Sequence, residues 1–87
     1  MIADSTKVLN LLKTARGQVD GLIKMVEDDR YCVDISNQIM ATTAVLKSCN
    51  RRVLDAHLNS CVAEAFETGE SEQKIKEIVE IIDKLTK

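Results

Sequence analysis

The spacing of apolar residues predicts helices along almost the whole chain. In the first 27 residues apolar side chains recur at intervals of three and four, which places them on one face of an α-helix. They are Val8, Leu11, Leu12, Ala15, Val19, Leu22, Ile23 and Val26. Asp4 or Ser5 can cap the start of this helix. The acidic run at 27–29 is expected to end it, because acids are unfavourable at a helix C-terminus.

A second and much longer helix is predicted to start near Tyr31, with Asp29 as its cap. No Gly or Pro interrupts residues 30–68, and Gly69 offers a left-handed stop. A helix of this length favours an oligomer or a bundle, because helices in globular proteins average about 11–12 residues. Its apolar positions are Ile35, Ile39, Thr42, Leu46, Cys49, Val53, Leu54, Leu58, Cys61 and Val62.

A third helix follows Gly69, with one apolar stripe that includes Ile75, Ile78, Val79 and Ile82. The chain has no proline and three glycines, which favours uninterrupted helices. We therefore predict an all-α fold: a single domain over residues 1–87 that forms a three-helix protomer with a long central helix. A lone chain of this size buries only about 60–65% of its unfolded surface and would be marginally stable.

The composition indicates the cellular compartment in which the protein is expected. Three cysteines are an odd count, which argues against a closed disulfide framework and favours reduced thiols. No run of about 18 apolar residues is present to span a membrane. The first residues lack the basic and apolar regions of a secretory signal. We expect a cytoplasmic protein without a membrane partner.

The charge pattern gives a mixed indication about nucleic acid. The formal net charge of −2 counts against a nucleic-acid binder. Residues 36–53 nevertheless carry three basic residues and no acid, whereas residues 62–87 carry seven acids and four bases. On this pattern alone, solvated charged helix faces are the plainer interpretation.

The only histidine, His57, precedes Cys61 by four residues, so both side chains project from one helix face. Imidazole and thiol are soft donors that suit a transition metal. A further thiol, Cys32, lies on the same predicted helix, 25 residues from His57, a separation of roughly 37 Å. These three side chains cannot bind one ion within one chain. An antiparallel partner would bring Cys32 of one subunit to His57 and Cys61 of the other, giving two sites per dimer.

One imidazole and two thiolates favour Cu(I) or zinc, and three ligands alone suit trigonal Cu(I) better. The plainer interpretation is that His57 and both thiols are packing residues, because Cys is among the most buried residue types. Cys49 continues an apolar stripe, so we predict a small core residue that takes no part in metal binding. The chain offers no set of base, nucleophile and orienting group, so we expect no enzyme.

Three runs of sequence stand out, from Arg16 to Leu22, from Asp29 to Ile35 with Gln38 and Ile39, and from Leu54 to Val62. They resemble the copper-sensing transcriptional repressors of the CsoR/RcnR family, and the resemblance covers nearly the whole chain. The Arg-Tyr-Cys and His-x-x-x-Cys pieces are its most specific part. The resemblance implies an antiparallel four-helix-bundle dimer that assembles as a dimer of dimers. It also implies that the metal-free homotetramer holds operator DNA until an inducer releases it, which derepresses copper-resistance (efflux) genes.

Within that family the ligand pattern implies the inducer. Copper sensors carry Cys, His and Cys at the positions of Cys32, His57 and Cys61, which makes Cu(I) the best match. Nickel and cobalt members use additional histidines, formaldehyde-responsive members lack the second thiol, and persulfide-sensing members lack the histidine. Tyr31 and Glu77 match a tyrosine and a glutamate that couple the metal site to DNA binding in copper-sensing relatives.

Two alternatives stay open. The nearest is a persulfide-sensing or thiol-redox-sensing repressor that uses Cys32 and Cys61 of neighbouring subunits. The other is a plain helical assembly module or metal buffer that binds no DNA.

The DNA contacts implied by the resemblance are basic side chains without a helix-turn-helix, so recognition would rely on shape and backbone contacts. Arg51 and Arg52 are the strongest candidates, and Thr14 stands where relatives commonly have a base. The full set is Lys7, Lys13, Arg16, Lys47, Arg51 and Arg52.

Overall fold

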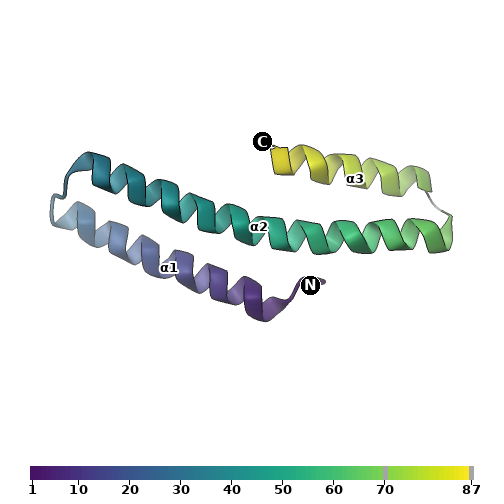
Figure 1. The fold of residues 1–87 in the computed structure, drawn as a ribbon, viewed down its shortest axis with the longest axis horizontal. Coiled ribbons are helices and arrows are strands. Elements are labelled where there is room, and N and C mark those ends of the chain that lie inside the picture. The colour runs from purple at the N-terminus through teal and green to yellow at the C-terminus, as the bar shows by residue number, and fades with distance from the viewer. Residues whose placement is uncertain (70, 87) are drawn as a thin grey trace. The chain divides into compact units, whose positions relative to one another are not determined.

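The computed structural model describes residues 1–69 and 71–86, and in this range it consists of three α-helices and no strand (Figure 1). Helix α1 spans Ser5–Glu27, α2 spans Cys32–Thr68, and α3 spans Ser71–Thr86. The 37-residue α2 is the uninterrupted central helix that the sequence predicts. No helix in the described part of the chain is long and apolar enough to cross a membrane.

Two of the predicted helix ends are confirmed. The Asp4 side chain caps α1: its Oδ1 accepts hydrogen bonds from the N–H groups of Thr6 at 3.0 Å and Lys7 at 3.4 Å. Gly69 follows α2 with a φ of 72°, the left-handed conformation that glycine adopts without strain.

The prediction that Asp29 caps the second helix is wrong. Asp29 has a φ of 52° and its N–H donates to the carbonyl of Val26 at 3.1 Å, so it belongs to the end of α1. Aspartate tolerates the left-handed conformation better than most residues, which fits it for this position. Helix α2 then begins at Cys32, directly after Tyr31.

The chain divides into two compact units, and α2 contributes to both. The N-terminal unit comprises residues 4–50, which are α1 and the first part of α2. The C-terminal unit comprises residues 1–3 and 51–87, which include the rest of α2 and all of α3.

In the N-terminal unit α1 runs antiparallel to the first part of α2. The buried thiol of Cys49 donates to the carbonyl of Val8 at 3.9 Å, while Val26 and Ile39 line one groove near the opposite end of α1. The prediction that Cys49 is a core residue is confirmed. Several large apolar side chains of this unit are exposed, including Leu9, Leu12, Val19, Ile23, Val26, Ile39, Met40 and Leu46.

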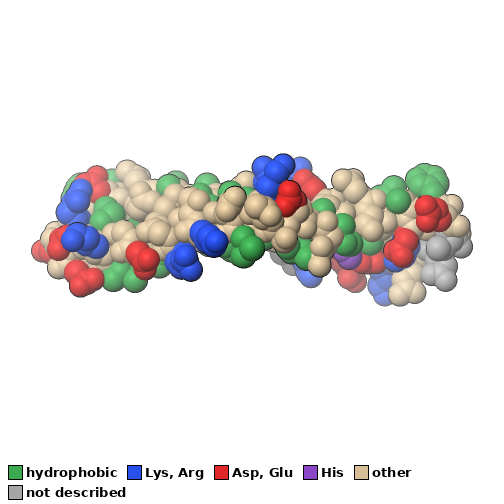
Figure 2. All heavy atoms as spheres, turned by 90° about the horizontal axis from the view of Figure 1, so that it is seen from below, with side chains coloured by type: hydrophobic (Ala, Val, Ile, Leu, Met, Phe, Trp, Pro, Cys, Tyr) green, Lys and Arg blue, Asp and Glu red, His purple; other side chains and the backbone are tan. Residues whose placement is uncertain are grey.

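In the C-terminal unit α3 folds back antiparallel along the second part of α2. Cys61 and Ile81 are buried, and Ala3 is buried in the same unit. Ile75, Val79 and Ile82 of the predicted α3 stripe are exposed. Hydrophobic side chains lie between charged ones on the face drawn in Figure 2. Each unit therefore buries only part of its apolar surface.

Candidate metal centre

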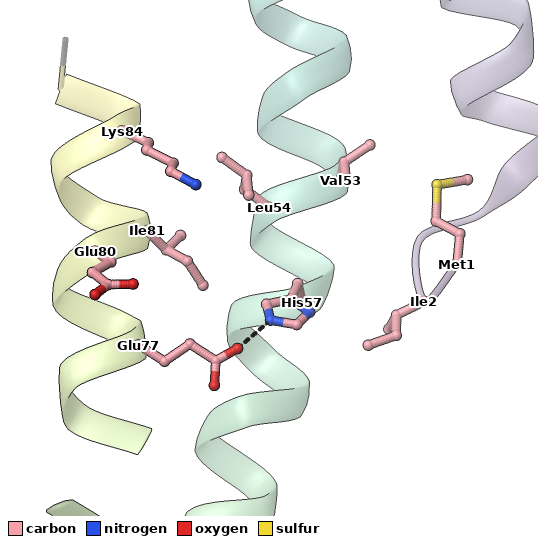
Figure 3. Close-up of a pocket in the computed structure, with 9 residues that line it drawn as sticks. All are labelled: Met1, Ile2, Val53, Leu54, His57, Glu77, Glu80, Ile81 and Lys84. Atoms are coloured by element: carbon pink, nitrogen blue, oxygen red, sulfur yellow. Dashed lines mark hydrogen bonds and ion pairs between the residues drawn. The ribbon is translucent and has the colours of Figure 1, made fainter. Parts of the chain in front are cut away.

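Three potential metal ligands converge in the C-terminal unit. His57 and Cys61 come from α2 and Glu77 from α3, and one ligand atom from each lies within 4.8 Å of the others. The Sγ of Cys61 is 3.5 Å from Nε2 of His57. The predicted placement of His57 and Cys61 on one helix face is therefore confirmed. Glu77 reaches His57 from the facing helix, as Figure 3 shows.

The contact between Glu77 and His57 fixes the imidazole. Oε1 of Glu77 lies 2.6 Å from Nε2 of His57, and this hydrogen bond is the main cause that lowers the pKa of Glu77 below its ordinary value. An ionised carboxylate only accepts, so Nε2 must carry the proton and donate it. In a neutral imidazole, Nδ1 is then the unprotonated nitrogen and keeps its lone pair. This lone pair is what a metal ion needs in order to bind the ring.

Cys61 is a buried thiol with 3% of its surface exposed. Burial is the largest cause that raises the pKa of Cys61, and the nearby Glu77 carboxylate raises it further. The side chain is therefore a protonated thiol at neutral pH. Because a metal binds the thiolate, occupation of this site must release a proton.

Lys74 extends the cluster along α3. Its Nζ donates to Oε2 of Glu64 at 3.0 Å and lies 3.8 Å from Oε2 of Glu77. The hydrogen bond to Glu64 is the largest cause that raises the pKa of Lys74. Sequence reasoning does not single out Lys74. Its only sequence signal is that Glu64 and Lys74 each lie five residues from Gly69, where a hairpin brings such positions together.

A pocket of about 550 Å³ opens beside the His57–Glu77 pair. Its walls come from α2, α3 and the first two residues, and it combines apolar side chains with an imidazole, two carboxylates and an ammonium group (Figure 3). The lining residues are Met1, Ile2, Val53, Leu54, His57, Glu77, Glu80, Ile81 and Lys84.

Two predicted site residues, Cys32 and Tyr31, belong to the N-terminal unit and lie outside the cluster of described ligands. Cys32 is an exposed free thiol, and Tyr31 is 58% exposed. The backbone carbonyl of Tyr31 accepts from the N–H of Ile35 at 3.2 Å at the start of α2. The role predicted for Cys32 requires another subunit, and the roles predicted for both side chains stay predictions.

The six basic side chains predicted to contact DNA are all exposed. Arg51 also forms an ion pair with Asp55 on the same face of α2, with Nε 3.2 Å from Oδ2. Exposed pairs of this kind contribute little to stability, so Arg51 can exchange Asp55 for a phosphate at small cost. The other members of the set are Lys7, Lys13, Arg16, Lys47 and Arg52.

An all-helical chain with a nitrogen, a sulfur and a carboxylate donor converging from two helices is a candidate transition-metal-binding protein. The family model described as metal-sensitive transcriptional repressor matches residues 4–84. The chain therefore belongs to this family, whose members are repressors and not enzymes. The resemblance drawn from the sequence is confirmed.

Individual relatives agree with the family assignment. The copper-sensing transcriptional repressor CsoR of Bacillus subtilis is 43% identical over 84 residues, which is 97% of this chain and 83% of the relative. The protein of the same name from Mycobacterium tuberculosis strain H37Rv is 38% identical over 82 residues, 94% of this chain and 69% of the relative.

Two solved structures share the fold. The crystal structure of the copper-sensing repressor CsoR with Cu(I) from Geobacillus thermodenitrificans has a TM-score of 0.80 and 41% identity, covering 94% of this chain and 85% of that one. The nickel-responsive transcriptional regulator InrS has a TM-score of 0.88 and 29% identity, covering 98% of this chain and 96% of that one.

Proposed function

We propose that this protein is a Cu(I)-responsive transcriptional repressor. Its metal-free form binds operator DNA, and Cu(I) held by Cys32 of one subunit with His57 and Cys61 of another releases the DNA. The regulated genes are those for copper resistance by efflux. Residues 1–87 act as one metal-sensing and DNA-binding domain, in the cytoplasm, where thiols stay reduced. The observation that carries the proposal is the His57–Cys61 pair, with its orienting carboxylate, in a chain of the metal-sensitive repressor family.

The donor set fits Cu(I). A thiol and an imidazole lie side by side, and the contact with Glu77 leaves Nδ1 of His57 available as a donor. Cu(I) prefers such soft ligands at low coordination number. Cys61 and His57, with Cys32 of another subunit, would hold the ion, which would supply a positive charge at the site. Cys32 is exposed, as a side chain that completes the site of a partner must be.

The exposed apolar side chains support assembly. Both units leave large aliphatic residues on the surface, including Leu12, Ile23 and Ile39 in the N-terminal unit and Ile75 and Val79 in the C-terminal unit. Unpartnered apolar surface on a small chain favours association, and a second antiparallel copy completes a four-helix bundle. A tetramer also multiplies the basic side chains that face DNA.

The thiol-sensing alternative fits less well. The nucleophile toward a persulfide is the thiolate, and burial and Glu77 raise the pKa of Cys61. His57 would have no role in such chemistry, yet it holds the shortest hydrogen bond of the cluster. Nickel is disfavoured because this chain has a single histidine.

The direct test is binding of the DNA upstream of the protein's own gene, measured by fluorescence anisotropy at fixed salt. Apo-protein should bind, and Cu(I) should weaken binding by about 5–150-fold, the usual range of allosteric coupling. Ni(II) and a persulfide donor should change it little. His57→Ala should abolish the response to Cu(I), whereas Asn59→Ala, an exposed residue of the same helix, should keep it.

Two outcomes would overturn the proposal. If Cu(I) leaves DNA affinity unchanged, the protein is not a copper-responsive repressor. If a persulfide donor releases DNA and His57→Ala still responds to it, the thiol sensor is the better description.

A further inference from the structure

We propose that Lys74 determines metal specificity: its ammonium group binds the second oxygen of Glu77 and so withholds this carboxylate from the metal. The inference rests on the proposed function, because it concerns the same metal site. Without such a restraint Glu77 is a third ligand from this chain, and the site would accept divalent ions.

The kinds of ligand atom in the site determine which metal ions it can bind. His57, Cys61 and Glu77 present a nitrogen, a sulfur and an oxygen within 4.8 Å of one another. If His57 ligated through Nε2, which would break its hydrogen bond to Glu77, these three side chains and Cys32 from a partner would make four ligands of the kinds that tetrahedral zinc uses. If Glu77 is excluded, one nitrogen and two sulfurs remain, which is a soft set for Cu(I). Metal choice therefore depends on what holds the Glu77 carboxylate.

Both oxygens of Glu77 have partners. Oε1 accepts from Nε2 of His57 at 2.6 Å, and Oε2 lies 3.8 Å from Nζ of Lys74. The two helical positions differ by three residues, so Lys74 and Glu77 share one face of α3. A hydrogen bond of 3.0 Å to Glu64 on α2 holds Nζ from the other side. The Lys74 side chain is 22% exposed, so its ammonium is confined between two helices.

The positive charge of Lys74 also discriminates between divalent and monovalent metal ions. Coulomb energy scales with the product of the charges, so a fixed ammonium group repels a divalent ion twice as strongly as a monovalent one at the same distance. Zn(II) and Ni(II) are divalent and Cu(I) is monovalent. Lys74 thus acts against divalent ions both by holding Glu77 and by its own charge. Lys74 is therefore a positioning residue and does not contact the metal itself.

Lys74→Met tests the inference, because methionine keeps an unbranched stem and removes the charge. In this variant Zn(II) and Co(II) affinity should rise about tenfold or more, while Cu(I) affinity should change by less than about threefold. Visible absorption of Co(II) reports whether an oxygen ligand has joined the site. Lys76→Met, at an exposed position of the same helix, is the matched control and should match wild type. Lys74→Arg keeps the charge and should preserve wild-type selectivity.

Glu77 itself supplies the decisive check. In Lys74→Met/Glu77→Gln the part of the gain in Zn(II) and Co(II) affinity that comes from Glu77 should disappear, which leaves only the smaller part that comes from the lost ammonium charge. A merely structural role for Lys74 predicts instead equal losses of all metals and a lower melting temperature. If Lys74→Met retains Cu(I) binding and gains no affinity for Zn(II) or Co(II), this inference alone is wrong. If the wild-type protein binds no Cu(I), the proposed function fails, and the inference fails with it.

Discussion

Glu77 on α3 accepts a hydrogen bond of 2.6 Å from Nε2 of His57 on α2. The carboxylate thereby selects the imidazole tautomer and holds the ring in position. The same contact joins the candidate ligand to a second helix. If His57 binds the metal as proposed, the charge change on its ring alters its attraction to Glu77, and α3 would then respond to occupation of the site.

Glu77→Gln should weaken both metal binding and the response to it. Glutamine still accepts from Nε2–H but lacks the negative charge that stabilises the ligated imidazole. Cu(I) affinity, measured by competition with a chelator, should fall by about 10–100-fold, the usual cost of losing such a partner. Glu80→Gln changes another glutamate of the same pocket and should have little effect. Wild-type affinity and DNA response in Glu77→Gln would refute the role assigned to this carboxylate.

Metal affinity should increase with pH. Burial and the Glu77 carboxylate raise the pKa of Cys61, so the thiol is protonated throughout the neutral range and loses its proton on binding. Below that pKa each released proton makes apparent affinity rise up to about tenfold per pH unit. Chelator competition between pH 7 and 8.5 measures this slope. A flat profile in the wild-type protein would contradict the proton count.

Cys49→Ala should separate core packing from metal binding. Cys49 is buried and its thiol contacts the carbonyl of Val8, so truncation should lower the free energy of unfolding by about 1–2 kcal/mol. Cu(I) stoichiometry should not change. Cys32→Ala is the reciprocal control: the exposed side chain should cost less than about 0.5 kcal/mol of stability but abolish tight Cu(I) binding. Loss of Cu(I) in Cys49→Ala would show that a ligand has been misassigned.

The sequence predicts the helices well, because their apolar spacing, the Asp4 cap and the Gly69 stop all act within a few residues. The His57–Cys61 pair is predictable for the same reason, since its spacing is one helical turn. Glu77 is different: it lies 20 residues from His57, and periodicity does not give the register of α3 against α2. In the sequence, only the resemblance to copper-sensing repressors indicates Glu77.

The role of Lys74 could not be predicted from the sequence for the same reason, because it depends on how α3 packs against α2. Its contacts with Glu64 and Glu77 depend on how the hairpin around Gly69 closes and on which rotamers fit between two helices. The prediction for Asp29 was wrong because it rested on a local preference alone. A residue type that favours caps was expected at the start of α2, but the left-handed turn that ends α1 uses it instead.

The central claim is that the metal site is shared between subunits, with Cys32 from one and His57 and Cys61 from the other. A mixed dimer of Cys32→Ser and His57→Ala subunits tests it. Two-fold symmetry leaves one intact site in that dimer and one site that lacks both residues. Each variant alone should bind no Cu(I) tightly.

The measurement is Cu(I) stoichiometry of the purified mixed dimer, with each subunit carrying a different affinity tag. The shared-site account predicts half the wild-type capacity, at wild-type affinity. No tight Cu(I) binding by the mixed dimer would contradict it, because a site formed within one chain is broken in both subunits.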